Sequence, residues 1–258
     1  AHEDRNGALE PRAVRDMNPS VPGFAVIMIA VMLASCLQGS IGFGMGMLAA
    51  PVVAVVDPGL VPGTLIMLAT LLTLLVVLRE GTAIDMRGTG WALLGRVPGT
   101  IAGALLLAAI PERALAILIA TVVLLGVAVT SLGWIPEPRR RNLMLAGATS
   151  GVLGTATSIG GPPMALVWQR SSGAQLRATM AGFFLVGSLM SIAMLAVTGA
   201  VDHHTVQMFA LLIPAAVLGY VLSCFANRIL TPLRQRWTAI AASTAGAVVL
   251  LVRQTGLL

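Results

Sequence analysis

Two long hydrophobic segments of this chain are each interrupted by a glycine-rich break. The first break lies in Gln38–Pro51 (QGSIGFGMGMLAAP) and the second in Thr157–Pro163 (TSIGGPP), and both contain Ser-Ile-Gly. Glycine inside a helix costs about 1 kcal/mol relative to alanine. In hydrocarbon, every backbone group that a break frees needs a partner within the protein. A helix that stops and restarts in such surroundings therefore indicates a site.

The composition places these breaks in a membrane. Of 258 residues, 57% are hydrophobic and 10% are charged, whereas soluble domains carry about 25% charged residues. The formal net charge of +6 comes from arginines that lie in short loops between apolar runs, which the positive-inside rule explains better than nucleic-acid binding does. The sequence therefore predicts an all-α polytopic membrane protein with no nucleic-acid partner.

Six apolar runs are each long enough, or nearly so, for one crossing of a core of about 30 Å. They are residues 60–78, 91–110, 114–132, 178–197, 206–225 and 237–252. The broken runs, 24–56 and 143–168, behave differently. The first is too long for one crossing, while its two arms are too short for two, so a re-entrant helical hairpin that turns near the midplane fits better.

Several features recur at nearly one spacing, which indicates two repeats of about 120 residues. Ser40-Ile41-Gly42 matches Ser158-Ile159-Gly160 at an offset of 118, Pro98 and Gly103 match Pro214 and Gly219 at 116, Pro111 matches Pro232 at 121, and Gly126 matches Gly246 at 120.

The distribution of arginines distinguishes two topologies, one in which each broken run is a hairpin and one in which it crosses the membrane once. If each broken run returns to its own side, one side of the membrane collects eleven arginines and the other collects Arg113 and Arg253. The eleven are Arg79, Arg87, Arg96, Arg139, Arg140, Arg141, Arg170, Arg177, Arg228, Arg234 and Arg236. If each broken run crosses once, the division is seven against six and shows no bias. The positive-inside rule thus favours hairpins, with the arginine-rich side cytoplasmic.

The predicted organisation has three parts. Residues 1–20 form a polar, mobile N-terminal tail, residues 21–136 the first transmembrane repeat and residues 137–258 the second. Each repeat is one hairpin plus three crossings, an odd number, so the second repeat is inverted relative to the first and both termini lie outside the cytoplasmic membrane. Inverted repeats with discontinuous helices are typical of secondary transporters.

The hairpin tips predict an anion site. Two helix N-termini would point N–H groups and the positive ends of their dipoles at one shared cavity, and neutral side chains would add donors. The predicted substrate-binding residues are Gln38, Gly39, Ser40, Ile41, Gly42, Phe43, Gly44, Thr155, Thr157, Ser158, Ile159, Gly160, Gly161, Pro162 and Arg96. Ser40 and Ser158 hold equivalent places in the two breaks, and each hydroxyl is expected to donate to the anion.

The acidic residues support an anion rather than a cation. All ten fall in the tail, in loops or at segment ends, whereas cation-coupled carriers usually place a carboxylate within the membrane. The sequence predicts a small anionic substrate and no enzyme, catalytic residue, cofactor or metal site. Two simpler interpretations stay open: the glycines could allow close helix packing, and Arg96 could only extend its charge to the cytoplasmic interface.

The two breaks together resemble a known family. Gly39-Ser40-Ile41-Gly42-Phe43-Gly44-Met45-Gly46 followed by Pro51, with Gly151 and Ser158 to Pro163, is similar to the TauE/SafE sulfite exporter family of permeases. The resemblance covers nearly the whole chain from about residue 21 and implies export of sulfite or of an organosulfonate such as sulfoacetate. Phe43 and Met45 depart from a fuller glycine run and could alter the size of the pocket.

The leading hypothesis is a transporter that exports a small sulfur oxyanion by alternating access. An anion channel would lack alternating access, and a membrane thiol oxidoreductase would use Cys36 and Cys224. The repeat argues against the oxidoreductase, because the positions equivalent to these cysteines are Gly154 and Ala108. The expected partners are the anion and the lipid bilayer, and a homodimer is left open.

Overall fold

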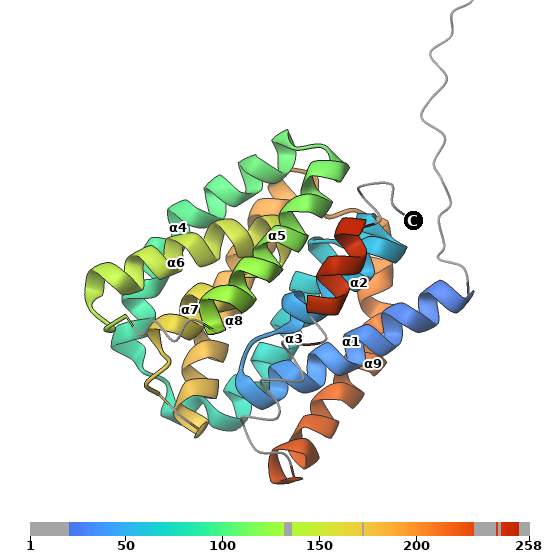
Figure 1. Ribbon diagram of the computed structural model, residues 1–258. Helices are drawn as coiled ribbons and strands as arrows, with labels where there is room; N and C mark the ends of the chain where they lie inside the picture. The colour runs from blue at the N-terminus through green and yellow to red at the C-terminus, as the bar shows by residue number, and fades with distance from the viewer. Residues whose placement is uncertain (1–20, 132–135, 172, 230–240, 242–243, 253–258) are drawn as a thin grey trace, which may run out of the picture.

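The computed structural model describes residues 21–131, 136–171, 173–229, 241 and 244–252, and its regular elements are all helices (Figure 1). They are α1 (Val21–Ile41), α2 (Met45–Val56), η1 (Pro58–Leu60), α3 (Gly63–Glu80), η2 (Gly81–Ala83), α4 (Met86–Ala109), α5 (Glu112–Ser131), α6 (Arg140–Thr157), α7 (Gly161–Val167), α8 (Gly173–Val197) and α9 (His203–Ile229). Residues 244–252 are also helical. The described part of the chain contains no strand, which confirms the all-α prediction. The predicted tail 1–20 lies outside it.

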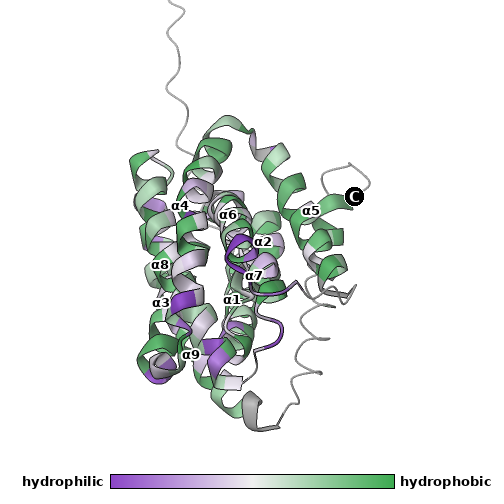
Figure 2. Ribbon diagram, turned by 90° about the vertical axis from the view of Figure 1, so that its left-hand side faces the viewer, coloured by the Kyte–Doolittle hydropathy of each residue, from purple (hydrophilic) through white to green (hydrophobic). Residues whose placement is uncertain are grey.

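Five helices among the described residues are long and apolar enough to cross a membrane. They are α1, α3 with η2, α4, α8 and α9, and Figure 2 shows hydrophobic colouring along most of the helices. Four of them match predicted crossings. Two predicted crossings remain. The crossing at 114–132 corresponds to α5, which has a shorter apolar stretch at Arg113–Val129, and the crossing at 237–252 is described only at residues 241 and 244–252. The chain is therefore a multi-pass membrane protein.

The first arm of the first broken run is longer than predicted. α1 has 21 residues, about 31 Å at 1.5 Å per residue, so the expectation that both arms are too short to cross is wrong for this arm. The helix runs through the polar residues before the break because each has a hydrogen-bond partner, within the helix or beyond it. The hydroxyl of Ser40, for example, donates to the carbonyl of Cys36 at 2.8 Å. α2, with 12 residues, is short as predicted.

α4 and α6 lie side by side (Figure 1), and they pack at backbone distance along a seam of glycines. Gly95, Gly99 and Gly103, spaced four apart on α4, face the carbonyl groups of Met144, Ala148 and Val152 on α6. A Cβ atom on any of them would collide with those carbonyls. Membrane helices associate through such close packing because the bilayer gives no hydrophobic drive between them.

α1 and α9 pack in the same manner on the other side of the bundle. Gly219 on α9 faces the carbonyl of Met32, and Gly39 on α1 faces the side chain of Ser223. Between these two pairs, α3 lies against α8. The packing interpretation of the glycines thus holds at these seams, and it leaves the glycines of the two breaks to be explained separately.

Two clusters of buried apolar side chains flank the breaks. One joins α1, α2, α3, α5 and α9, and the other joins α4, α6, α7 and α8 around Phe183. Phe43, in the first break, packs against both clusters. The breaks therefore lie between two cores.

The α4–α6 seam can be tested with a matched pair of glycine variants. Gly99→Ala places a methyl group against the Ala148 carbonyl and should lower the free energy of unfolding by about 1–3 kcal/mol. Gly90→Ala, on the same helix but with open space around it, should raise it by up to about 1 kcal/mol through helix propensity. Thermal unfolding in detergent micelles measures both. Equal shifts would show that α4 and α6 do not pack as described.

Candidate functional site

The two breaks meet at the centre of the bundle. Gly46, at the start of α2, lies against the carbonyl of Ser158, and Gly161, at the start of α7, lies against the ring of Phe43. A side chain at either glycine would separate the breaks. Close approach of two interrupted helices is therefore the first role of these glycines.

The breaks differ in the residue that carries the turn. In the first, Gly42 and Gly44 adopt positive φ angles of 88° and 122°, a region that glycine enters at no steric cost. In the second, α6 ends at Thr157 and Ser158 itself is left-handed, with φ 61°. Ser40 thus lies inside a helix, while its equivalent Ser158 lies in the turn.

A cavity of about 40 Å³ lies where the breaks meet. By the same measure a cavity of about 10–15 Å³ holds one water, so this one has room for a small oxyanion. Its walls are Gln38, Phe43, Gly44, Met45, Gly46, Met47, Ile66, Ala69, Arg96, Gly154, Ser158, Ile159, Gly160, Gly161, Phe184 and Ser188.

Arg96 brings a positive charge to this cavity. It comes from α4, is 2% exposed and donates from Nη1 to the hydroxyl of Ser150 at 3.0 Å. Its Nε–H is buried with no partner among the described residues. No carboxylate in the described part of the chain forms an ion pair with it. Arg96 is therefore a buried cation with an unused donor and no counter-ion.

The surroundings of Arg96 are shaped to hold a guanidinium. A Cβ atom on Gly187 of α8 would collide with Nε and Cζ, so this glycine provides the space that the side chain occupies. The rings of Phe183 and Phe184 lie 4.9 Å and 5.5 Å from Cζ, within range for cation–π attraction. This burial favours the cavity interpretation of Arg96 over the interfacial one.

Ser150 connects Arg96 to the second break. Its hydroxyl accepts from Arg96 and donates to the carbonyl of Gly160 at 2.7 Å. The position of the guanidinium is thus coupled to the backbone just before α7.

Gln38 connects the first break to α3. Its Oε1 accepts the N–H of Met45, the first residue of α2, at 3.1 Å, and its Nε2 donates to the carbonyl of Ala69 at 3.2 Å. One of the N–H groups at the start of α2 is therefore already satisfied by a side chain, and those of Gly46 and Met47 follow at the cavity wall.

The start of α7 supplies fewer donors than the sequence predicts. The helix begins Gly161-Pro162-Pro163, and proline has no N–H group. Two of the first three residues thus cannot donate to an anion. The two helix N-termini are unequal, and Arg96, linked to the second break through Ser150, is the cationic group on the α6–α7 side.

Eight of the fifteen predicted site residues line the cavity: Gln38, Phe43, Gly44, Arg96, Ser158, Ile159, Gly160 and Gly161. The other seven lie near the breaks but outside its walls: Gly39, Ser40, Ile41, Gly42, Thr155, Thr157 and Pro162. The hydroxyls of this second group have partners: Ser40 donates to the Cys36 carbonyl, Thr155 bonds Ser191 and Thr157 donates to the Leu153 carbonyl. A role for these seven in substrate binding stays a prediction.

Sequence reasoning missed the wall that α3 and α8 contribute. Ser188 lines the cavity, and the hydroxyl of Thr70 donates to it at 2.7 Å. Phe183, Phe184 and Gly187 surround Arg96 on the same helix. These residues lie in an unbroken apolar run with no motif. The one available signal was that Thr70 and Ser188 are 118 residues apart, the same offset as Ser40 and Ser158.

Neither a carboxylate nor a thiol lines the cavity among the described residues. The most buried carboxylate, Asp57, follows α2 and accepts the N–H of Gly59 at 3.1 Å, and burial raises its pKa. Cys36 and Cys224 are free thiols on α1 and α9. The features that point to chemistry at the cavity are thus cationic and neutral donors.

The family comparison agrees with this picture. A protein-family model described as "Sulfite exporter TauE/SafE" matches residues 27–250. Comparisons with curated proteins and with solved structures gave no match.

The role of Gln38 can be tested through stability. Gln38→Met keeps the length of the side chain but leaves the buried N–H of Met45 without its acceptor, so it should cost about 1–3 kcal/mol of unfolding free energy. Ser35→Ala is the control, because the Ser35 hydroxyl donates only to the carbonyl of Val31 in its own helix. Thermal unfolding of the two variants in micelles should therefore differ, and equal stability would contradict the capping role.

Proposed function

The chain belongs to the sulfite exporter TauE/SafE family, and from this premise we propose that it carries a small sulfur oxyanion, sulfite or an organosulfonate, by alternating access. Members of this family are membrane anion transporters and not enzymes. The observation that carries the finer proposal is the buried, unpaired Arg96 at a cavity between two helix breaks.

Electrostatics favours an anion at this place. An unpaired ion in a low-dielectric interior costs several kcal/mol, and no described carboxylate relieves that cost for Arg96. A bound oxyanion would accept from the unused Nε–H and supply the missing charge. Charge-assisted bonds between a guanidinium and an oxyanion are also shorter and stronger than neutral ones.

Neutral donors complete the proposed site. Ser158 and Ser188 line the cavity with Arg96, as do Gly46 and Met47 in the first turn of α2. The hydroxyls of Ser158 and Ser188 donate to the carbonyls of Thr157 and Leu185, and each would turn toward the anion on binding. The N-terminus of a helix favours negative charge. At about 40 Å³, the cavity fits sulfite as it stands, whereas an organosulfonate would require it to widen.

Alternating access rests on two inverted repeats, which the packing supports. Thr70 and Ser188 are 118 residues apart and contact one another, as expected of equivalent residues beside a pseudo-two-fold axis. Asp85 and Asp202, 117 residues apart, both accept an N–H three residues ahead, at the start of α4 and of α9. Both α4–α6 and α1–α9 are closely packed pairs, and the proposed repeat would make them equivalent to one another.

Contacts between helix ends support the hairpin topology. Arg177, near the start of α8, forms a two-point ion pair with Glu80 at the end of α3, with both N–O distances 3.0 Å. If each broken run crossed once, these two residues would lie on opposite sides of the membrane. At the opposite ends of these helices, Thr64 at the start of α3 donates to the carbonyl of Thr205 at the start of α9, at 3.3 Å. These two helix starts therefore also lie on one side of the membrane, as the hairpin topology requires.

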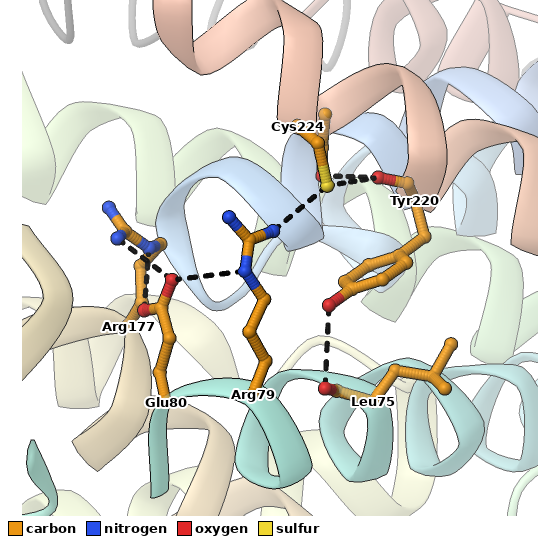
Figure 3. A network of polar contacts seen from close by, with 7 residues as sticks. Leu75, Arg79, Glu80, Arg177, Tyr220 and Cys224 are labelled. Carbon is orange, nitrogen blue, oxygen red and sulfur yellow. Dashed lines mark hydrogen bonds and ion pairs between the residues drawn. The ribbon is translucent and has the colours of Figure 1, made fainter. Parts of the chain in front are cut away.

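The Glu80 ion pair is also part of a network of polar contacts at one end of the bundle (Figure 3). Arg79 lies 4.0 Å from Glu80 and donates to the thiol of Cys224 at 2.9 Å, while Tyr220 donates to the carbonyl of Leu75 at 3.4 Å. The network ties α3 of the first repeat to α8 and α9 of the second. At the opposite end, the positions equivalent to Glu80 and Arg177 are Thr198 and Gly59, which cannot form an ion pair. We therefore assign this network as the inner gate.

The anion site predicts a specific pattern of transport loss. Arg96→Gln should weaken sulfite binding by about a hundredfold, since losing one partner of a buried charge pair costs about 2–5 kcal/mol, and Arg96→Lys should retain part of the activity. Ser158→Ala should weaken binding about tenfold, as expected for a hydrogen bond to a charged group. Sulfite flux into proteoliposomes, with counterflow to separate a carrier from a channel, measures each variant.

Two controls separate binding from folding in this experiment. Ser35→Ala removes a buried hydroxyl that bonds within its own helix and lies outside the cavity walls, and should transport almost as wild type. Arg96→Gln should keep or raise thermal stability, because it removes a buried charge without a counter-ion. Wild-type flux in Arg96→Gln, or no flux of sulfite or organosulfonates in the folded wild type, would refute the proposal.

The inner gate can be tested independently of the anion. Glu80→Gln breaks the ion pair with Arg177. A cysteine introduced at Ser188 should then be labelled from the arginine-rich side about two- to fivefold faster, the range expected for the loss of a partly exposed ion pair. Glu137→Gln makes the same change of charge in the exposed pair with Arg139 and should leave labelling unchanged. Faster labelling from the opposite side would overturn the gate assignment.

A further inference from the structure

A second and larger hollow lies on the outside of the bundle, between α5, α6 and α7. It has a volume of about 430 Å³, in the range of cavities that bind small organic molecules. Its walls are Val122, Leu125, Gly126, Val129, Pro136, Asn142, Leu145, Ala146, Thr149, Leu153, Pro162, Pro163, Leu166 and Val167. We call it the α5–α6 groove. It is almost entirely apolar and separate from the anion cavity.

The groove leads along α6 to a run of arginines. Its α6 residues, Asn142, Leu145, Ala146, Thr149 and Leu153, follow the spacing of one helix face. One turn before Leu145 on that face is Arg141, and three residues before Asn142 is Arg139. Arg140 points elsewhere, because its guanidinium lies over the ring of Trp91 on α4, at 4.9 Å.

Of these arginines, Arg141 has the charge that is available at the groove. Arg139 is paired with Glu137 at 2.7 Å. Arg141 is exposed and forms no ion pair with any described residue. The groove thus presents an apolar trough with an uncompensated cation at one end.

From this combination we propose that the α5–α6 groove binds one anionic phospholipid, with an acyl chain in the trough and the phosphate at Arg141. In a bilayer, the side chains that line an empty trough lose dispersion contacts, and a lipid acyl chain that occupies the trough restores them. A chain alone gives no selectivity, because it leaves one apolar environment for another. Selectivity comes from the arginine, since basic residues at the edge of the hydrocarbon attract anionic headgroups.

The bound lipid also has a structural consequence. At the end of the groove away from the arginines, Gly126 of α5 faces the ring of Pro162. Pro162 belongs to the short helix α7, whose first residue, Gly161, lines the anion cavity. A chain in the groove therefore packs behind α7 and supports the second break from outside. The proposal rests on the groove and its charge, and it does not depend on which anion is carried.

The test is lipid binding to the full chain, measured by native mass spectrometry of the purified protein with phosphatidylglycerol or phosphatidylcholine of identical chains. The wild type should bind phosphatidylglycerol about fivefold more tightly, the effect of one basic residue near a headgroup. Arg141→Gln should abolish this preference. Arg140→Gln, which makes the same change of charge on the α4 side, should keep it. Equal affinity for the two lipids, or equal effects of the two variants, would overturn the proposal.

A second pair of variants tests the trough itself. Leu145, which is 56% exposed in the groove, can be replaced by Trp to fill it, while Leu105→Trp on α4, at a site 61% exposed, is the control. Leu145→Trp should reduce phosphatidylglycerol binding and Leu105→Trp should not. If Leu145→Trp instead abolished a dimer of the chain and left lipid binding unchanged, the groove would be a subunit interface and the lipid proposal would be wrong.

Discussion

The charge of Arg96 inside the bundle is the constraint to which most of the central architecture responds. A guanidinium is expensive to bury, and here no described carboxylate balances it. Its neighbours therefore provide what an ion pair would otherwise supply: two aromatic faces, the hydroxyl of Ser150, and the space left by Gly187. Such a set stabilises a cation incompletely, and a site that is incomplete without an anion is suited to binding and releasing one.

The glycine seams explain how such a site can be held rigidly without a hydrophobic drive between helices. α4, which carries Arg96, lies against α6 at backbone distance through Gly95 and Gly99. Ser150, on the facing helix α6, then reaches both Arg96 and the carbonyl of Gly160. Close packing thus fixes the register between the charged side chain and the second break. A looser seam would leave the guanidinium at the wrong height relative to the turn.

The sequence predicts the breaks well because their signals are local. Glycines that interrupt apolar runs and a duplicated Ser-Ile-Gly identify both turns, and the membrane class follows from composition. Residues whose roles depend on a distant partner were beyond this reasoning. Gln38 was named as a donor to the anion, yet its oxygen accepts the N–H of Met45 and its amide donates to the carbonyl of Ala69. Ser188 was not named because only the packing of α3 on α8 brings it to the cavity. Ser40 lies inside α1, whereas Ser158 follows α6 in a left-handed conformation. The shared Ser-Ile-Gly does not indicate which residue of each break carries the turn.

The repeat that the sequence predicts would account for the scaffold but not for the charge. The offset of 116 that relates Gly103 to Gly219 places Leu212 at the position equivalent to Arg96, and the offset of 118 relates Gln38 to Ala156. Both of the distinctive polar side chains at the cavity therefore come from the first half of the chain, while the second half contributes hydroxyls and backbone. An anion bound by Arg96 must lie off any axis between the halves, closer to the second break that Ser150 holds. The two sides of the cavity therefore differ in charge, with the guanidinium beside the second break and neutral groups beside the first.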